Sequence, residues 1–242
     1  MRLDKFLVEA GVGSRTEVKQ LLKKKMVKVN DVVESSAKRH INEITDKITC
    51  QGQALTYEKY VYYLLNKPKG VISATEDNHH QTVLDLLDKK AWDKAVFPVG
   101  RLDIDTHGLL LLTNNGPLAH AMLSPKRHID KLYQAKVEGI MTDEDVEAFE
   151  KGIILEDFTC QPAQLVIKEI DNLTQTTIVQ ITIKEGKFHQ IKRMVAACGK
   201  KVVDLQRLGM GPLALEKNLS LGQWRHLTSE ELERLVVFNV DL

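Results

Sequence analysis

The stretch that decides the fold is GRLDIDTHGLLLLTNNG, residues 100–116. Its centre, Leu109–Leu112, is an unbroken apolar run that predicts a buried strand. Arg101 and two aspartates, Asp103 and Asp105, stand in the loop at the mouth of this strand. A carboxylate that a rigid strand holds in a loop is suited to act as a nucleophile or a base. The alternative is a structural ion pair between Arg101 and Asp105 on the surface of a tight turn.

Three generic motifs fail to explain this stretch. Phosphatases of the haloacid dehalogenase type place Asp-x-Asp-x-Thr after an apolar strand, but Thr106 comes one place too early and Gly-Arg stands where the strand should be. An EF-hand calcium loop needs a glutamate at its twelfth position, which here is Asn114. Neither GxxxxGK[ST] nor GxGxxG occurs in the sequence, which excludes a phosphate-binding loop and a dinucleotide fingerprint of those types.

Composition predicts a soluble protein with room for two domains. The chain has 242 residues, of which 43% are hydrophobic, enough to bury a proper core. No apolar run approaches the length of a membrane span, and the N-terminal MRLDKFLVEAG carries charges among its apolar positions. Cys50, Cys160 and Cys198 are widely spaced and lack metal-ligand spacing, which predicts reduced thiols. We therefore expect a cytoplasmic protein.

Charge is distributed unevenly along the chain. The net charge is only +1, but residues 1–40 carry ten basic and five acidic side chains, which leaves +5 there and −4 on the remainder. Arg15, Lys19 and Lys23 recur every four residues, as a stripe on one face of a helix would. This asymmetry predicts a small module that binds a polyanion, and a solvated lysine face is the alternative.

The basic segment itself predicts two helices and a hairpin. Apolar residues at helical spacing predict a first helix over 3–10, which ends at one of the glycines that follow. Ser14 and Glu17 form a capping box that starts the second helix. Residues 27–33 alternate around an Asn-Asp turn, and residues 46–50 offer one more strand before a glycine.

From Tyr60 onward, strands alternate with short helices. The predicted strands are 61–66, 109–113, 131–138, 164–170 and 176–184. The predicted helices are 82–88, 117–123, 142–151, 188–198 and 229–238, the last with a second capping box at Thr228 and Glu231. Hairpin-like strand pairs with irregular helices favour the α+β class and a largely antiparallel sheet. The domain boundary is expected near residues 52–60.

Residues 100–116 resemble the signature of the RsuA-type pseudouridine synthases, the small-subunit ribosomal RNA branch of the enzymes that convert uridine to pseudouridine. Three more segments are similar to this family in order and spacing: LNKPKGVISAT (65–75), KLYQAKVEG (131–139) and EGKFHQIKRMVAACGKKVVDLQRLGMG (185–211). Residues 1–31 are similar to the αL RNA-binding domain of a small-subunit ribosomal protein and of tyrosyl-tRNA synthetases. The resemblance implies an RNA-binding domain at 1–56 and a catalytic domain at 60–242, with a mixed sheet and flanking helices around a central cleft.

By position, the resemblance makes Asp103 the catalytic aspartate and Arg101 the loop arginine that helps to hold the target base outside the RNA. Tyr133 matches the family tyrosine that packs against this base, and Lys192 matches the basic residue that pairs with the aspartate. The wider superfamily often has arginine at this last position, so lysine gives a monodentate partner in place of a fork. Leu132 departs from the many relatives that have threonine before the tyrosine.

The reaction that the resemblance implies breaks the glycosidic bond, turns the uracil and rejoins it through ring carbon five. It involves no net redox change and no group donor, so neither a cofactor nor a metal is expected. The base must leave the RNA stack. Asp103 must be ionised, whether it attacks the ribose anomeric carbon, adds to the uracil ring or removes the 2′ proton; all three routes stay open. A nearby ammonium favours the ionised carboxylate, and the Tyr133 hydroxyl could assist the final proton removal.

Other polar residues are given simpler roles. Basic side chains around Lys192 are expected to contact RNA phosphates, which positions the RNA without specifying its sequence; they are Lys187, His189, Arg193, Lys200 and Lys201. The adjacent His79 and His80 lack a third ligand and are expected in solvent instead of on a metal. Asp105 is expected to cap the loop that presents Asp103.

The expected function is the isomerisation of one uridine in small-subunit (16S) ribosomal RNA by a protein whose first module docks on structured RNA. The resemblance implies a monomer. A large-subunit (23S) ribosomal RNA enzyme of the same family is the closest alternative, because fold and catalytic residues are shared. Within the resemblance, the short first module, the lysine in HQIKR and the stretch DIDTHGLLLLTN (103–114) favour the small-subunit branch. A non-catalytic RNA-binding assembly factor is the alternative from another class, and the set Asp103, Tyr133 and Lys192 argues against it.

Overall fold

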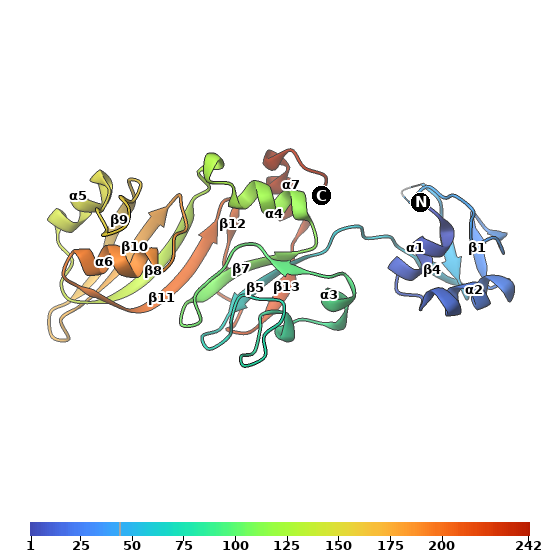
Figure 1. The fold of residues 1–242 in the computed structure, drawn as a ribbon, viewed down its shortest axis with the longest axis horizontal. Helices are drawn as coiled ribbons and strands as arrows, with labels where there is room; N and C mark the ends of the chain where they lie inside the picture. Colours follow the sequence, from blue (N-terminus) through green and yellow to red (C-terminus); the bar gives the residue numbers. More distant parts are fainter. Residues whose placement is uncertain (44) are drawn as a thin grey trace. The chain divides into compact units, whose positions relative to one another are not determined.

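The computed structural model describes residues 1–43 and 45–242, which form two compact units, Met1–Lys59 and Tyr60–Leu242 (Figure 1). The first unit packs two helices against a small antiparallel sheet with the strand order β2-β1-β3-β4. Its elements are α1 (Leu3–Glu9), α2 (Arg15–Lys23), β1 (Val27–Val29), β2 (Val32–Val33), β3 (Ile48–Cys50) and β4 (Gln53–Leu55).

Local sequence signals determine the elements of the first unit. The capping box is confirmed, because the Ser14 backbone N–H donates to Glu17 Oε2 at 2.7 Å and the Glu17 N–H donates to Ser14 Oγ at 3.4 Å. The hairpin is confirmed too: Asn30 and Asp31 form its two-residue turn with positive φ values of 54° and 64°, the backbone that the twist of a two-residue hairpin favours. The apolar faces of both helices and of β1 and β3 close one core.

The second unit is built on a nine-stranded sheet. Its main path runs β13-β5-β7-β11-β8-β10-β9, with β6 added to β7 and β12 added to β11. The strands are β5 (Tyr62–Lys67), β6 (Phe97–Pro98), β7 (His107–Thr113), β8 (Lys131–Glu138), β9 (Gln164–Asp171), β10 (Thr176–Ile183), β11 (Lys201–Met210), β12 (Leu213–Ala214) and β13 (Trp224–His226). The helices are η1 (Leu84–Leu86), α3 (Lys89–Asp93), α4 (Gly116–Leu123), η2 (Pro125–Arg127), α5 (Asp143–Lys151), α6 (Gln190–Ala197), α7 (Ser229–Leu235) and η3 (Val236–Phe238).

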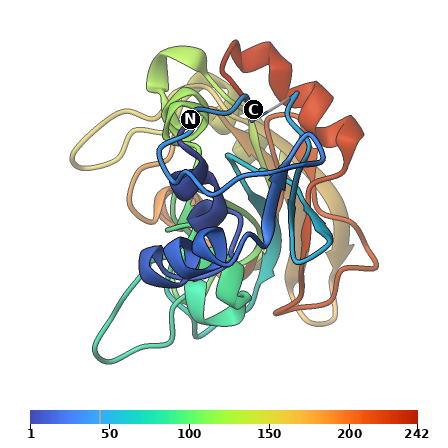
Figure 2. The same cartoon turned by 90° about the vertical axis from the view of Figure 1, so that its right-hand side faces the viewer.

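Helices bury the sheet on both faces around β7. Leu110 and Leu112 belong to a core shared with α3, α5 and α6, whereas Leu109 and Leu111 belong to a second core shared with α4 and α7. This two-sided burial explains why the strand is apolar at consecutive positions instead of alternating ones. In Figure 2, α4 (green) and α7 (red) lie at the same end of the unit, and η3, which follows α7, packs in the second core with α4.

The sheet changes direction once, between β7 and β11. These two strands are parallel, and they pair over only two positions, His107 with Gln206 and Gly108 with Arg207. The other pairs among the described strands are antiparallel, so this contact joins two antiparallel halves. The α+β class with a mixed, largely antiparallel sheet is confirmed.

Glycine is required at this join. Gly108 has a φ of +108°, and a Cβ there would lie 2.3 Å from the Arg207 carbonyl oxygen and 2.7 Å from the Arg207 nitrogen. Both the backbone conformation and the close approach exclude a side chain. The Arg207 side chain adds a further contact between the two strands, because its Nε donates to the Leu109 carbonyl oxygen at 2.7 Å.

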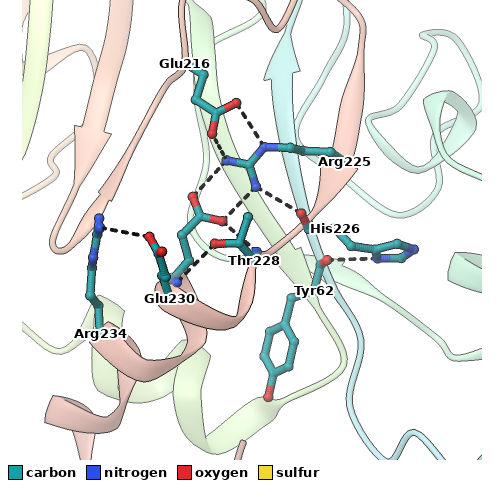
Figure 3. A network of polar contacts seen from close by, with 8 residues as sticks. Tyr62, Glu216, Arg225, His226, Thr228, Glu230 and Arg234 are labelled. Atoms are coloured by element: carbon teal, nitrogen blue, oxygen red, sulfur yellow. Dashed lines mark hydrogen bonds and ion pairs between the residues drawn. The ribbon is translucent and has the colours of Figure 1, made fainter.

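An ion-pair network ties the edge strand β13 to α7 (Figure 3). The Arg225 guanidinium donates to both carboxylate oxygens of Glu231, at 2.7 and 2.8 Å, and reaches Glu216 Oε1 at 2.8 Å. Glu231 also accepts the Thr228 N–H at 2.9 Å, which confirms the second capping box. The hydrogen bonds from Arg225 lower the pKa of Glu231, as expected for a carboxylate that accepts charge-assisted hydrogen bonds.

Most predicted elements of the second unit are present, and one is wrong. The strands predicted at 131–138, 164–170 and 176–184 match β8, β9 and β10 within one residue, and α4, α5, α6 and α7 lie within their predicted ranges or start one residue earlier. The helix predicted at 82–88 is replaced by the short turn η1, because the Asp85 carboxylate folds back to accept the Thr82 N–H at 2.8 Å and Leu87 is extended. Residues 201–210 were not predicted as a strand, although β11 is the longest of the described strands.

We predict that Gly108→Ala destabilises the second unit by about 3 kcal/mol, because it combines a strained backbone with a backbone clash. Gly116→Ala is the matched control, since a Cβ at the start of α4 meets nothing within 4 Å. Urea unfolding followed by tryptophan fluorescence tests this prediction, because both tryptophans, Trp92 and Trp224, lie in the second unit. Equal midpoints for the two variants would show that the join tolerates a side chain.

Candidate active site

The loop that precedes β7 forms one wall of a pocket at the join of the two half-sheets. Side chains from three parts of the unit line it: Arg101, Asp103 and Thr106 from the loop, Tyr133 from β8, and His189 and Lys192 from the start of α6. The sequence separates these groups by up to 91 positions, so the pocket is a product of the sheet order and not of any local motif.

Backbone contacts fix the loop on both sides of Asp103. Before it, the Leu102 N–H donates to Ser73 Oγ at 3.0 Å, and this hydroxyl donates to the Leu102 carbonyl at 2.9 Å. After it, the Gly70 N–H donates to the Ile104 carbonyl at 2.7 Å. Asp103 is therefore presented by a loop whose neighbouring peptides are both held by the segment that follows β5.

Lys67, the last residue of β5, fixes the backbone of the loop that carries Asp103. Its side chain is fully buried, and its ammonium donates to the backbone carbonyls of Pro68, Asp103 and Thr106 at 3.0, 3.1 and 2.9 Å. An ammonium has three N–H donors, so three carbonyls satisfy it completely. Burial lowers the pKa of Lys67 to about 8, although the nearby Asp103 and Asp105 act to raise it.

Lys192 bridges the two aspartates of the loop. Its ammonium lies 2.9 Å from Asp103 Oδ2 and 2.6 Å from Asp105 Oδ1. The hydrogen bond from Lys192 lowers the pKa of Asp105. Partial burial acts to lower the pKa of Lys192, but hydrogen bonds to Asp105 and Asp103 outweigh it, so the pKa is raised. Lys192 is therefore charged throughout the neutral pH range.

The structure gives Asp105 a partner that the sequence did not predict. Its carboxylate is part of the ion cluster with Lys192 instead of serving only to cap the loop. The alternative ion pair between Arg101 and Asp105 is not among the ion pairs of residues 1–43 and 45–242. Arg101 is exposed and lines the pocket, free to contact a ligand.

His189 approaches the other oxygen of Asp103. Its Nε2 lies 3.7 Å from Asp103 Oδ1, on the opposite oxygen from Lys192. His189 has a left-handed backbone with φ 50°, which is why α6 starts at Gln190 and not at 188 as predicted. This backbone places the imidazole at the end of the helix, beside the carboxylate.

Tyr133 lies in a row of residues that crosses the sheet beneath the pocket. Strand register pairs Lys67 with Gly108, Gly108 with Arg207, and Arg207 with Tyr133. Paired residues on adjacent strands project to the same face. The row therefore sets two buried cations on either side of a glycine, next to the tyrosine, and 8% of the Tyr133 surface remains exposed.

Lys67 and Arg207 are functional candidates that the sequence reasoning missed. Arg207 is 2% exposed, and its Nη2 has no hydrogen-bond partner among the described residues. A buried arginine and a buried lysine are rare unless their charge is used. The position of Lys67 at the end of the apolar stretch of β5 was the available signal for this residue. Arg207 lies in a segment for which no strand was predicted.

Comparisons with known proteins identify the families of both units. Residues 61–197 match the family model of RNA pseudouridylate synthase, and residues 1–43 match that of the S4 domain. The chain belongs to the RNA pseudouridylate synthase family. It is therefore an RNA pseudouridine synthase, an isomerase, with an S4 domain at its N-terminus.

Relatives of this pseudouridine synthase cover nearly its whole length. "Ribosomal small subunit pseudouridine synthase A" of Vibrio cholerae is 42% identical, with 96% of this chain and 98% of the relative covered. "Ribosomal large subunit pseudouridine synthase B" of Bacillus subtilis is 41% identical, with 97% and 95% covered. A solved structure titled "Crystal structure of pseudouridylate synthase" is 34% identical, covers 98% of this chain and 100% of its own, and has a TM-score of 0.66.

The remaining basic candidates of the synthase differ in exposure and in whether their side chains form ion pairs. Lys187 is exposed and lines the pocket. Arg193 forms an ion pair with Asp157 and lies 5.3 Å from the ring centroid of Phe158. Lys200 is engaged with Asp145 at 2.8 Å and is mostly buried, so the expectation that it contacts phosphate is not supported. Its neighbour in the sequence, Lys201, is exposed.

The basic stripe on the S4 domain is exposed as predicted from the helical spacing. Arg15, Lys19 and Lys23 lie on α2 and point into solvent, while Val18 and Leu22 on the same helix are buried in the core. The hydrogen bonds of α2 and its capping box therefore present three cations on one helical face.

Two histidines lie beside aspartate side chains. His107, at the start of β7, lies 3.1 Å from the Asp204 carboxylate, which also binds Lys69 at 2.5 Å. His80 pairs with Asp77 in an exposed loop.

Within residues 1–43 and 45–242 there is no group of three or more His, Cys, Asp or Glu side chains that could hold a metal ion. No helix in this described part of the chain is long and apolar enough to cross a membrane.

We predict that the single-turnover rate of the synthase falls by about tenfold as pH rises from 7 to 9, because Lys67 loses its proton near pH 8. The neutral amine has two N–H donors for three carbonyls, so the loop that carries Asp103 is held less firmly, and small misplacements of a reacting group cost large factors in rate. Lys69→Met, a lysine two positions away on Asp204, should show the same fall. A rate that stays flat over this range would contradict the prediction.

Proposed function

We propose that this synthase isomerises one uridine of small-subunit ribosomal RNA, with Asp103 as the catalytic carboxylate. The observation that carries the proposal is the ion pair of Asp103 with Lys192, 2.9 Å long, inside a pocket that also contains Tyr133. The reaction breaks the bond from uracil N1 to the ribose anomeric carbon and forms a bond from C5 to the same carbon. A proton leaves C5 and N1 gains one, so atoms and charge balance.

Each pocket residue has a step that its geometry suits. Lys192 places its ammonium 2.9 Å from Asp103 Oδ2, so the carboxylate keeps a charged partner when a bound nucleotide excludes water. Tyr133 offers its ring face to the uracil and its hydroxyl to the proton that leaves C5. Arg101 is planar, always charged and exposed at the pocket, so it suits the space that the flipped base vacates or a neighbouring phosphate.

Support for the small subunit comes from relatives that carry this name and cover both chains almost fully, from Vibrio cholerae at 42% identity and Haemophilus influenzae at 36%. The large-subunit enzyme of Bacillus subtilis at 41% identity supports the second candidate, a uridine of large-subunit ribosomal RNA. The chemistry at Asp103 is the same for both targets, so the choice of RNA depends on surface contacts and RNA shape.

We predict that Asp103→Asn lowers the rate of pseudouridine formation at least about a thousandfold while RNA affinity is kept, because the amide is isosteric but cannot act as a nucleophile or base. Asp105→Asn is the matched control: the same change two residues away leaves Lys192 on Asp103, so its rate should stay within about tenfold of wild type. Release of tritium from ring carbon five of labelled RNA measures both rates. Equal losses in the two variants would remove Asp103 from its proposed role.

Mapping of pseudouridine by carbodiimide labelling and primer extension identifies the target RNA. Cells that lack the gene should lose one stop in the small-subunit RNA, and wild-type protein but not Asp103→Asn should restore it. A lost stop in the large-subunit RNA would favour the second candidate. No change on either RNA would favour an RNA-binding assembly factor.

We predict that replacing Arg15, Lys19 and Lys23 together by glutamine lowers the slope of log affinity against log salt for ribosomal RNA by about 2, because each phosphate contact releases counterions. The control replaces three exposed lysines of the same unit that lie outside α2, which are Lys28, Lys38 and Lys47. Filter binding from 50 to 300 mM salt measures the slope. A larger change in the control than in the α2 variant would place the RNA face elsewhere on this unit.

A further inference from the structure

We propose that Phe188 is a stacking platform for a base of the RNA strand next to the flipped nucleotide, a role that rests on the proposed function. Phe188 stands two residues before α6 and is 76% exposed. It is the most exposed aromatic side chain of the residues that the structure describes. Single exposed apolar residues are common on proteins, so the proposal depends on where this ring lies and what holds it.

The ring is held in a defined place beside the catalytic carboxylate. Phe188 stacks on the His189 imidazole, with ring centroids 3.8 Å apart and planes 17° from parallel. His189 in turn lies 3.7 Å from Asp103 Oδ1. The two neighbours of Phe188 in sequence, Lys187 and His189, both line the pocket. The exposed ring is thus attached to the rim of the site through a stacked partner.

The residues on either side of Phe188 in the sequence are basic or aromatic instead of apolar, since they are Lys187 and His189. Lys187 lines the pocket, and its ammonium lies 5.7 Å from the ring centroid of Phe158. The Arg193 guanidinium lies 5.3 Å from the same ring. A patch that binds another protein would be expected to gather apolar neighbours around the phenylalanine. Cations that track phosphates beside an open aromatic ring are the arrangement with which proteins bind unpaired RNA bases.

The reaction creates a need for such a ring. When the target uridine leaves the strand, the bases on either side of it lose a stacking partner, which is part of the cost of flipping. An aromatic ring at the rim of the pocket can replace that partner for one of them. Stacking is tolerant of base identity, so Phe188 would contribute affinity for the flipped state and would not select the sequence.

The kinetic test compares Phe188→Ala with Phe188→Trp on unmodified transcripts of both ribosomal RNAs. Loss of one base–aromatic stack should raise KM for the RNA by about tenfold in Phe188→Ala while kcat stays within about twofold. Phe188→Trp should restore KM. Leu173→Ala is the control, because Leu173 is 97% exposed in the turn between β9 and β10 and is not part of the pocket. A KM for Phe188→Ala within twofold of wild type would overturn the proposal.

A fluorescence test separates base stacking from phosphate binding. The indole of Phe188→Trp, after subtraction of the wild-type signal from Trp92 and Trp224, should be quenched by an RNA hexamer of adenylate. An abasic hexamer with the same phosphates should bind without this quenching. Equal quenching by both oligomers would overturn the proposal.

The quenching test also separates this proposal from the proposed function. In the double variant Phe188→Trp with Asp103→Asn, base-dependent quenching should persist although no pseudouridine forms. If the wild type modifies neither ribosomal RNA, the proposed function fails, while base-dependent quenching would still support Phe188 as a stacking platform. If the wild type is active and no quenching depends on bases, the platform alone fails.

Discussion

The parallel contact between β7 and β11 is the constraint on which the rest of the second unit depends. Two residue pairs join two antiparallel half-sheets, and only glycine at position 108 allows the backbones to come together. The loop with Asp103 enters β7 at this point, while Lys192 lies on α6, which precedes β11. The pocket therefore forms because two strands from distant parts of the sequence pair here. The loop before β7 and the helix before β11 are thereby brought together.

Buried charge around the join is arranged so that each cation has an anion or carbonyl partner. Lys67 satisfies its three donors on backbone carbonyls, two of them in the loop that carries Asp103, and Arg207 donates to the carbonyl of Leu109. Lys192 alone bonds to side-chain carboxylates. The cations thus have two roles: Lys67 and Arg207 hold the backbone in place, and Lys192 forms ion pairs with the two aspartates of the loop.

Sequence reasoning succeeded where structure depends on near neighbours. The capping boxes at Ser14 and Thr228 and the hairpin turn at Asn30 each need residues no more than three positions apart, and all are present. It failed at β11, where Asp204 and Arg207 interrupt the apolar pattern. Arg207 is stable inside the strand only because it reaches a carbonyl 98 positions away. The role of Lys67 was missed for the same reason, because its partners are backbone carbonyls, which no residue type in the sequence marks.

Arg101, which is proposed to contact RNA, and Asp103, which is proposed to react, lie in one short loop. The Leu102 peptide between them is held by Ser73, and the carbonyl of Asp103 by Lys67. If Arg101 contacts RNA, as proposed, that RNA acts on a segment whose backbone is held on both sides of the Asp103 side chain. The proposed roles are therefore compatible: the exposed Arg101 side chain can adapt to an RNA strand while the held backbone keeps Asp103 on Lys192.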